Sequence, residues 1–342
     1  MGAGLIGASM GIGLSAEGWD VTIEDASEEA ARLARGIGAG GALKLGTEPD
    51  VVVVAVPPSA ASDEVLKALK AWPSAVVTDV ASVKAPLARA VEGSEAASRY
   101  VGSHPMAGRE VSGGLAAQGD LFKARPWAIC PNAASPEAVA QVRAIAEALG
   151  ADVVTMDADA HDAAVARVSH APQAVASAVA AALDGLDAAD VALAGQGLRD
   201  VTRIAASAPE MWADIARLNS APIRATIARI VDDLVALRDA EDLGVAMASL
   251  VARGQREVAR IPGKHGTKQR DWAAVTVIVP DRPGELLRLL SDVAALGVNV
   301  EDLVIEHSPR QPAGLVTLSV DPARREDLSA ALTERAWEVA AS

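Results

Sequence analysis

The sequence contains a single cysteine and very few aromatic side chains. Cys130 is the only cysteine among 342 residues, so neither an intrachain disulfide nor a cysteine-cluster metal site can form. We therefore expect no bound metal. Phe, Trp and Tyr together make up 2% of the chain, although 51% of its residues are hydrophobic. The cores must consequently be built from closely packed Ala, Val, Leu and Ile.

Positive charge is also scarce. The chain has 31 Lys and Arg residues against 45 Asp and Glu residues, which gives a formal net charge of -14. A field of that sign repels nucleic acid and anionic membrane surfaces. No apolar run approaches the ~20 residues that span a bilayer, and no signal-peptide pattern is evident. We expect a cytoplasmic protein, in which an anionic substrate needs a local cationic pocket.

The hydrophobic pattern changes twice along the chain. Residues 1–156 alternate short β-branched runs with amphipathic stretches, which predicts an α/β Rossmann-like domain with parallel strands and crossover helices. Residues 157–260 have helical spacing instead, which is typical of an all-α domain. The predicted strands are 21–23, 51–56, 75–78, 100–102, 127–130 and 153–155, and the predicted long helices are 172–186 and 221–237.

The C-terminal part has a third pattern. Residues 261–271 are polar and rich in Gly, Pro and Lys, which predicts a linker. Residues 272–342 then predict a small α+β domain with the order βαββα. Its elements are a strand at 273–279, a turn at 281–284, a helix at 285–296, strands at 300–306 and 314–320, and a final helix.

A glycine cluster at the start of the chain predicts a dinucleotide site. Gly2, Gly4 and Gly7 fit the pattern G-x-G-x-x-G, whose glycines allow a tight turn and close approach of a pyrophosphate to a helix N-terminus. Asp25, after the predicted strand 21–23, can accept hydrogen bonds from ribose hydroxyls and would repel a 2′-phosphate. We therefore predict NAD rather than NADP. The predicted cofactor residues are Gly2, Gly4, Leu5, Ile6, Gly7 and Asp25.

The glycine pattern normally follows a strand, but only Met1 precedes Gly2. That strand is central in a doubly wound sheet, so its removal would leave two neighbouring strands with unpaired backbone groups. Our hypothesis is that Met1 is an internal or misassigned start within the true first strand. In-frame upstream DNA without an apolar run of codons would refute it.

A histidine on a loop bounded by glycine and proline is the most informative chemical feature. His104, within residues 102–108, is a natural proton acceptor for an alcohol that is being oxidised. This loop, together with residues 78–84 and 199–205, resembles prephenate dehydrogenase, an oxidative decarboxylase of tyrosine biosynthesis. The resemblance covers nearly the whole chain. The turn at 281–284 is similar to that of an ACT domain, a small amino-acid-sensing module.

The resemblance implies a reaction and a set of residues that carry it. His104 accepts the proton of the 4-hydroxyl of prephenate while C4 gives a hydride to NAD, after which CO₂ leaves and the ring becomes aromatic. Ser82 bonds the hydroxyl or the histidine, and Glu110 lies at the mouth of the pocket. By their residue types alone, Ser82 could equally be a helix N-cap and Glu110 a solvated charge.

The substrate is a dianion, so a guanidinium is the expected carboxylate ligand. The resemblance assigns that role to Arg203, and helical spacing places Asp200 on the same face, where it can orient the arginine. Trp212 forms an apolar wall of the pocket, or else belongs to the core. His170 lies near the cofactor or substrate entrance. His161, nine positions before it, falls on the opposite face of a continuous helix, and we interpret it as structural.

The same resemblance implies that the helical domain forms a homodimer and that the ACT domain senses an amino acid. L-Tyrosine is the expected effector, although such domains often only oligomerise. The predicted regulatory residues are Asp281, Arg282, Pro283, Gly284 and Asn299.

Three other functions remain open. Arogenate dehydrogenase differs only in an amino group on the substrate side chain. A β-hydroxyacid dehydrogenase would need a catalytic lysine in the helical domain, but residues 157–259 contain none. An inactive amino-acid-binding regulator is the third alternative, and it is suggested by the missing first strand.

Overall fold

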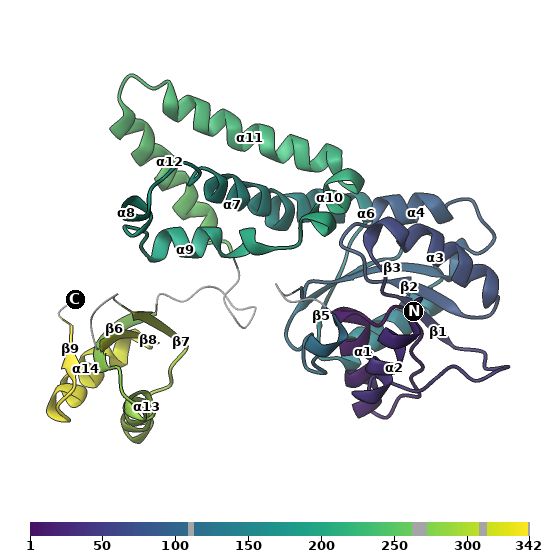
Figure 1. Ribbon diagram of the computed structural model, residues 1–342, viewed down its shortest axis with the longest axis horizontal. Helices are drawn as coiled ribbons and strands as arrows, with labels where there is room; N and C mark the ends of the chain where they lie inside the picture. The colour runs from purple at the N-terminus through teal and green to yellow at the C-terminus, as the bar shows by residue number, and fades with distance from the viewer. Residues whose placement is uncertain (109–112, 262–271, 308–312, 341–342) are drawn as a thin grey trace. The chain divides into compact units, whose positions relative to one another are not determined.

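The computed structural model describes residues 1–108, 113–261, 272–307 and 313–340. The chain divides into two compact units, Met1–Leu243 and Gly244–Ser342. Figure 1 shows helices and strands in both. Within the described residues, no helix combines the length and apolar character needed to cross a membrane.

The first unit begins with a five-stranded sheet in the order β1-β2-β3-β4-β5. The predicted alternation of strands and helices is present. Runs of valine form the strands at 51–54 and 76–79, and the side chains of Ser27 and Ser135 cap the helices that begin at Glu28 and Pro136. The strands are β1 (Val51–Val54), β2 (Val76–Asp79), β3 (Tyr100–Pro105), β4 (Pro126–Cys130) and β5 (Asp152–Thr155). The helices are α1 (Leu5–Ala16), α2 (Glu28–Gly36), α3 (Pro58–Ala71), α4 (Ala85–Val91) and α5 (Pro136–Ala148).

The sheet is not wholly parallel, which corrects the sequence prediction. β1, β2 and β3 are parallel, but β4 pairs antiparallel with β3, and β5 is parallel to β4. Parallel neighbours need a crossover connection, usually a helix. The described part of the segment between β3 and β4 contains only a short 3₁₀ turn at Gly114–Ala116. The chain therefore returns in the opposite direction.

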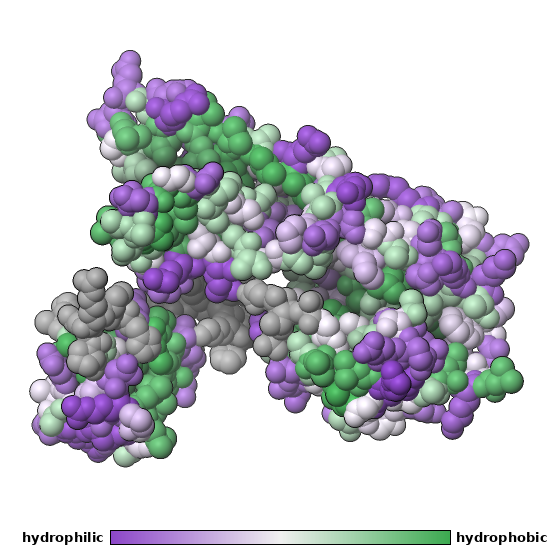
Figure 2. Space-filling model, in the orientation of Figure 1, coloured by the Kyte–Doolittle hydropathy of each residue, from purple (hydrophilic) through white to green (hydrophobic). Residues whose placement is uncertain are grey.

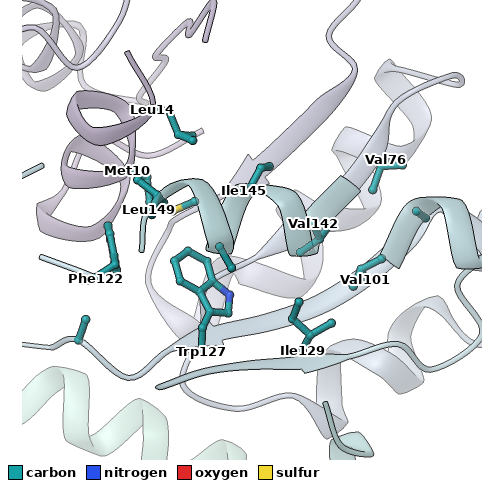
Figure 3. Packing of buried hydrophobic residues seen from close by; sticks show 13 residues of the cluster. Met10, Leu14, Val76, Val101, Phe122, Trp127, Ile129, Val142, Ile145 and Leu149 are labelled. Atoms are coloured by element: carbon teal, nitrogen blue, oxygen red, sulfur yellow. The ribbon is translucent and has the colours of Figure 1, made fainter. Parts of the chain in front are cut away.

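Two apolar layers cover the sheet. On one face, α1 and α5 pack against side chains of β2, β3 and β4. Figure 3 shows Trp127 within this cluster, between Phe122 and Ile129. On the other face, α3 and α4 cover β1, β2 and Tyr100. Phe122 and Tyr100 are the only Phe and Tyr of the chain, and both are fully buried.

The rest of the first unit is helical, as predicted. The elements are α6 (Ala158–Val165), a π-helical turn η3 (Ala166–His170), α7 (Ala171–Ala181), α8 (Ala188–Val191), α9 (Gln196–Thr202), a 3₁₀ turn η4 (Arg203–Ala206), α10 (Pro209–Leu218) and α11 (Ser220–Arg238). The helix predicted at 221–237 is confirmed by α11. The helix predicted at 172–186 ends earlier, at Ala181.

The second unit contains the predicted order of strand, helix, two strands and helix. After α12 (Leu243–Val258), these are β6 (Ala273–Pro280), α13 (Glu285–Ala295), β7 (Asp302–His307), β8 (Ala313–Val320) and α14 (Arg325–Glu334), with a short β9 (Glu338–Val339) added. The sheet order is β7-β8-β6-β9, and every pairing is antiparallel. Apart from Ile261, the predicted linker lies outside the described residues.

Residues 21–23, predicted as a strand, do not join the five-stranded sheet. They form only an isolated bridge, between Thr22 and Gly41. A cavity of about 260 Å³ lies between these residues and β1, and it is lined by apolar side chains of both. The backbone of Met1 pairs with the β1 segment through two hydrogen bonds. Met1 N donates to Val53 O at 2.7 Å, and Ala55 N–H donates to Met1 O at 2.7 Å. Gly2 N–H donates to Glu24 O on the other side. The cavity thus lies where one further strand would pair on both edges.

We predict that a short extended apolar segment joined ahead of Met1 will stabilise the fold. It would fill the cavity and add backbone hydrogen bonds to both neighbouring segments. At roughly 2–4 °C per kcal/mol for a unit of this size, the melting temperature should rise by several degrees. Differential scanning calorimetry measures this change. A Gly-Ser segment of equal length is the control, and equal melting temperatures for the two proteins would contradict the prediction.

Candidate active site

The glycine loop has the shape that a dinucleotide phosphate requires. Gly2 has φ +98°, and a Cβ there would lie 2.2 Å from Ala55 O. A Cβ on Gly7 would lie 2.0 Å from Gly2 O. Gly4, by contrast, has nothing within 4 Å of its Cβ position and precedes the first residue of α1. Protein atoms therefore leave no room for side chains at Gly2 and Gly7, whereas the space beside Gly4 is empty. Because Gly4 stands at the N-terminus of α1, the residues present fit a pyrophosphate.

Asp25, which is predicted to bind the ribose, also makes hydrogen bonds within the protein. Its Oδ2 accepts a hydrogen bond from Ala3 N–H at 2.7 Å, and its Oδ1 accepts one from Ser27 N–H at 2.8 Å. The carboxylate thereby fixes the glycine loop against the start of α2. Each oxygen retains a further lone pair, so a ribose hydroxyl can still donate to it. Binding of ribose by Asp25 stays a prediction.

His104 lies at the carboxyl end of β3, on the same edge of the sheet as the glycine loop. Two observations place the segment that follows it near this loop: Ala107 belongs to the same buried cluster as Met10 of α1, and the Cβ position of Gly114 is 2.8 Å from Ala3 O. Ligands of open α/β sheets bind outside the carboxyl ends of the strands. The predicted base and the predicted cofactor loop therefore share one edge.

A chain of side chains extends from His104 into the helical segment. His104 Nδ1 lies 2.9 Å from His161 Nε2, and His161 Nδ1 lies 2.8 Å from Asp162 Oδ1. Asp162 also accepts Lys84 N–H at 2.8 Å and Ala85 N–H at 2.9 Å. Among the described residues, His104 Nε2 has no hydrogen-bond partner, and 8% of the residue is exposed. Nε2 is thus the ring atom available to a bound molecule.

The sequence pattern did not identify the position of His161. On a continuous helix, the nine positions from His161 to His170 would place the two side chains on opposite faces. The π-helical turn Ala166–His170 interrupts that helix and makes the count invalid. Both imidazoles oppose protonation of His104 electrostatically, so both lie near it. The adjacent pair His161-Asp162 was the available signal, because a carboxylate can hold a neighbouring imidazole.

A buried ion pair supports the strand end that carries His104. Lys84 Nζ pairs with Asp79 and donates a hydrogen bond to Ser103 O at 2.6 Å. Tyr100 Oη donates to the other Asp79 oxygen at 2.8 Å. Burial, and then the Asp79 charge, raise the pKa of Tyr100 well above its ordinary value, so the phenol stays protonated and keeps donating. The network joins the ends of β2 and β3.

The electrostatics of the site keep His104 and His170 neutral. Burial lowers the pKa of His104 well below 6.5, and His161, Lys84 and His170 lower it further. Burial also lowers the pKa of His170 to about 4, against the opposing effect of Asp162. A neutral His104 carries a lone pair at physiological pH, as a proton acceptor must.

His170 and Trp212 lie together, as their predicted roles require. His170 is buried, and its Nδ1 lies 3.1 Å from Asn219 Nδ2, which also donates to Asp162 O at 2.8 Å. The Trp212 ring meets His170 edge-on, with 6.0 Å between ring centroids. Its Nε1 is buried without a hydrogen-bond partner among the described residues. Asn219 therefore links His170 to the segment that holds His161.

Comparison with known proteins agrees with this geometry. The nucleotide-binding domain of prephenate dehydrogenase matches residues 11–155, and its dimerization domain matches residues 157–243. A probable prephenate dehydrogenase from Streptomyces niveus is 35% identical over 354 aligned residues, which cover 98% of this chain and 97% of that protein. The chain belongs to the prephenate dehydrogenase family.

Solved structures of the family have the same fold. Prephenate dehydrogenase from A. aeolicus, in complex with hydroxyphenyl propionate and NAD⁺, superposes with a TM-score of 0.66 at 28% identity, over 75% of this chain and 96% of that chain. Synechocystis arogenate dehydrogenase superposes with a TM-score of 0.60 at 27% identity, over 76% of this chain and 94% of that chain. The family matches end at residue 243, so they do not identify the C-terminal unit as an ACT domain.

Four more residues of this chain were predicted to contact the substrate or the residues that bind it. Ser82 is half-buried and is not a helix N-cap, since α4 is preceded by Lys84. Arg203 is exposed, at the first position of η4. Asp200 accepts a hydrogen bond from Gln196 Nε2 at 2.8 Å. Glu110 lies outside the described residues. The substrate roles of all four stay predictions.

We predict that Gly4→Ala will weaken NAD binding without destabilising the fold. The new methyl group meets no protein atom within 4 Å, but it occupies the open side of the phosphate loop. The dissociation constant should rise at least about tenfold, which corresponds to roughly 1.4 kcal/mol. Isothermal titration calorimetry measures it, with Gly36→Ala as the control in a similarly open helix position. Unchanged NAD affinity would contradict the placement of the phosphate at Gly4.

Proposed function

We propose that this protein catalyses the NAD-dependent oxidative decarboxylation of prephenate to 4-hydroxyphenylpyruvate. The observation that carries the proposal is His104 itself. It is a neutral imidazole with an unpartnered Nε2, and it lies at the sheet edge that also carries the glycine loop. The family supports an NAD-dependent dehydrogenase acting on prephenate or a close analogue of it.

The cofactor is NAD, and the glycine loop and Asp25 are the residues that would hold it. When bound, it accepts the hydride from C4 of the substrate ring. His104 Nε2 takes the hydroxyl proton as C4 becomes a ketone carbon. The bond from the ring to the carboxylate then breaks, CO₂ leaves, and its electron pair completes the aromatic ring, while the ring oxygen takes back the proton from His104 and becomes the phenol hydroxyl. The net change is one hydride transferred and one CO₂ released, and His104 ends in its initial neutral state.

Burial of His104 supports this role. Because burial keeps the imidazole neutral and excludes most water, the ring is ready to accept a proton and has little competing solvent at Nε2. Ser82 lies in the loop that follows β2, next to the strand that carries His104. We assign it the hydrogen bond to the substrate hydroxyl, because the described structure gives its own hydroxyl no partner.

The substrate carboxylates need cations and donors. We assign Arg203 to one carboxylate, and we assign Trp212 and His170 to the wall beside the ring. The buried, unpartnered Nε1 of Trp212 and its contact with His170 support this placement, because a substrate oxygen can satisfy that donor. Glu110 would contribute at the pocket mouth.

A homodimer is the assembly we propose. The helical segment matches a domain described as a dimerization domain. The 19-residue helix α11 has only one buried residue, Ile223, and exposes Val231, Leu234 and Val235. Figure 2 shows hydrophobic side chains gathered along this helix. A second copy of the chain would cover this face.

Arogenate is the second candidate substrate. The structural similarity to Synechocystis arogenate dehydrogenase nearly equals that to the A. aeolicus prephenate dehydrogenase, and the two substrates differ only in one side-chain substituent.

We also propose that the C-terminal unit senses L-tyrosine. Its supporting feature is the turn of Asp281, Arg282, Pro283 and Gly284 between β6 and α13, in which Gly284 adopts φ +92°. The turn leaves Leu286 and Leu287 exposed beside it. Asn299, the other predicted regulatory residue, donates to Glu301 Oε1 at 2.6 Å.

The decisive experiment is a substrate panel. Prephenate and arogenate are each offered with NAD and with NADP, in the presence and absence of tyrosine, and NADH or NADPH formation is followed by absorbance. We expect turnover of prephenate with NAD and inhibition by tyrosine. Turnover of arogenate alone would select the second candidate, and turnover of neither would overturn the proposed function.

We predict that His104→Asn will lower kcat by roughly 10²- to 10⁴-fold with little change in substrate binding, because the proton acceptor is lost.

The pH profile of the wild-type enzyme tests the same residue. Since the pKa of His104 lies well below 6.5, kcat/KM should stay constant from neutral pH down to 6.5 and fall only at more acidic pH, as Nε2 becomes protonated. A fall centred above pH 7 would contradict the assignment.

For Arg203→Gln we predict a raised KM and a nearly unchanged kcat, because the guanidinium binds a carboxylate that does not react. The loss of one charged hydrogen bond corresponds to roughly 1.5–3 kcal/mol, or about a 10- to 150-fold rise in KM. Initial-rate kinetics measure both constants. Arg229→Gln, on the exposed surface of α11, is the matched control. A normal KM in Arg203→Gln would remove this residue from the substrate site.

A further inference from the structure

The hydrogen bonds of Asp162 determine which nitrogen of His161 carries a hydrogen. The carboxylate accepts two backbone N–H groups, from Lys84 and Ala85, and its Oδ1 lies 2.8 Å from His161 Nδ1. A carboxylate that accepts in this way has no hydrogen to donate, so His161 Nδ1 must be the donor. A neutral imidazole with its hydrogen on Nδ1 has a lone pair on Nε2.

The same reasoning extends one step further, to His104. His161 Nε2 lies 2.9 Å from His104 Nδ1. With a neutral His161, the Nε2 lone pair accepts this bond, and His104 Nδ1 must carry the hydrogen. The lone pair of neutral His104 is therefore on Nε2, the nitrogen without a partner among the described residues.

We infer that His161, held by Asp162, is a positioning residue that fixes His104 in the tautomer whose Nε2 accepts a proton. The identity of that proton, the substrate hydroxyl, rests on the proposed function, whereas the tautomer does not. The arrangement follows the logic of a Ser-His-Asp triad, in which a buried carboxylate fixes the orientation and tautomer of the catalytic imidazole. Here a second imidazole stands between the carboxylate and the base.

The hydrogen bond between the two histidines changes when His104 acquires a charge. When Nε2 takes a proton, the ring becomes a cation in a buried site where His161, Lys84 and His170 oppose a positive charge. The bond from its Nδ1–H to His161 Nε2 then becomes charge-assisted and stronger. Asp162 lies behind His161, and Asp79 pairs with Lys84, so both carboxylates lie within this network.

His170 provides an internal contrast. Its Nδ1 lies 3.1 Å from Asn219 Nδ2, and the amide nitrogen can only donate. His170 must therefore accept at Nδ1 and carry its hydrogen on Nε2. The structure thus assigns the Nδ1–H tautomer to His104 and His161 and the Nε2–H tautomer to His170.

Nitrogen NMR of the wild-type chain tests these assignments, and variants of the site are needed only to identify the resonances. The protein contains five histidines, so labelling with ¹⁵N-histidine and long-range ¹H–¹⁵N correlation at pH 7 resolve each ring. Single substitutions to Gln identify the resonances. We expect protonated Nδ1 for His104 and His161 and protonated Nε2 for His170. A hydrogen on Nε2 of neutral His104 would overturn the inference.

Kinetics test whether the hydrogen bond between His104 and His161 matters for catalysis. His161→Leu removes the acceptor for His104 Nδ1–H, whereas His161→Gln keeps an acceptor in its amide oxygen. We expect kcat to fall at least about 10²-fold in the Leu variant, with KM changed less than about twofold, and to fall less in the Gln variant. His307→Leu, in the C-terminal unit, is the control for loss of an imidazole. A Leu variant with wild-type kcat, or with only KM raised, would overturn the inference.

The two experiments separate this inference from the proposed function. Failure of the wild-type protein to oxidise either prephenate or arogenate would overturn the function, and the NMR pattern would still decide the tautomers. Turnover by the wild type together with reversed tautomers would overturn the inference alone. If His161→Leu does not fold, the Gln variant and the wild-type spectrum carry the decision.

Discussion

The carboxylate of Asp162 joins the sheet and the helices of Met1–Leu243. It accepts the backbone N–H groups of Lys84 and Ala85, where the chain leaves β2 for α4, and it holds His161 at the start of the helical segment. Without it, two buried N–H groups would lack acceptors, at a cost of roughly 1–3 kcal/mol each. Asp162 therefore helps to hold α6 against the start of α4, where His161 can contact His104.

The site also depends on how it handles buried charge. Lys84 is fully buried, and its ammonium group is compensated by Asp79 and by the carbonyl of Ser103. This pair fixes the ends of β2 and β3, and the positive charge of Lys84 adds to burial in lowering the pKa of His104. The same network that holds the strand in place therefore keeps the imidazole neutral. One set of contacts therefore both holds the strands and favours the neutral, proton-accepting form of His104.

Local patterns predicted much of the fold. The glycine loop, the β-branched strands 51–54 and 76–79 and the helix α11 follow from periodicity and backbone sterics, which act over a few residues. The reversal of β4 could not be predicted, because strand direction depends on the path of the connection. The prediction that residues 21–23 form a strand of the sheet was wrong for a related reason. A strand needs a partner at hydrogen-bond distance, and sequence periodicity does not say whether one is present.

The sequence by itself determined that His104 is suited to proton transfer, that the first glycines suit a phosphate, and that a helical region follows the nucleotide-binding region. Those properties belong to residue types and short spacings. The predicted loop position of His104 was wrong, because β3 continues through it to Pro105 and pairs it with Ala128 of β4. Only the tertiary structure decided that His161 faces His104, that Asp25 fixes the glycine loop, and that Asn219 joins His170 to Asp162. These contacts connect segments far apart in the chain, and a single π-helical turn is enough to change which side chains meet.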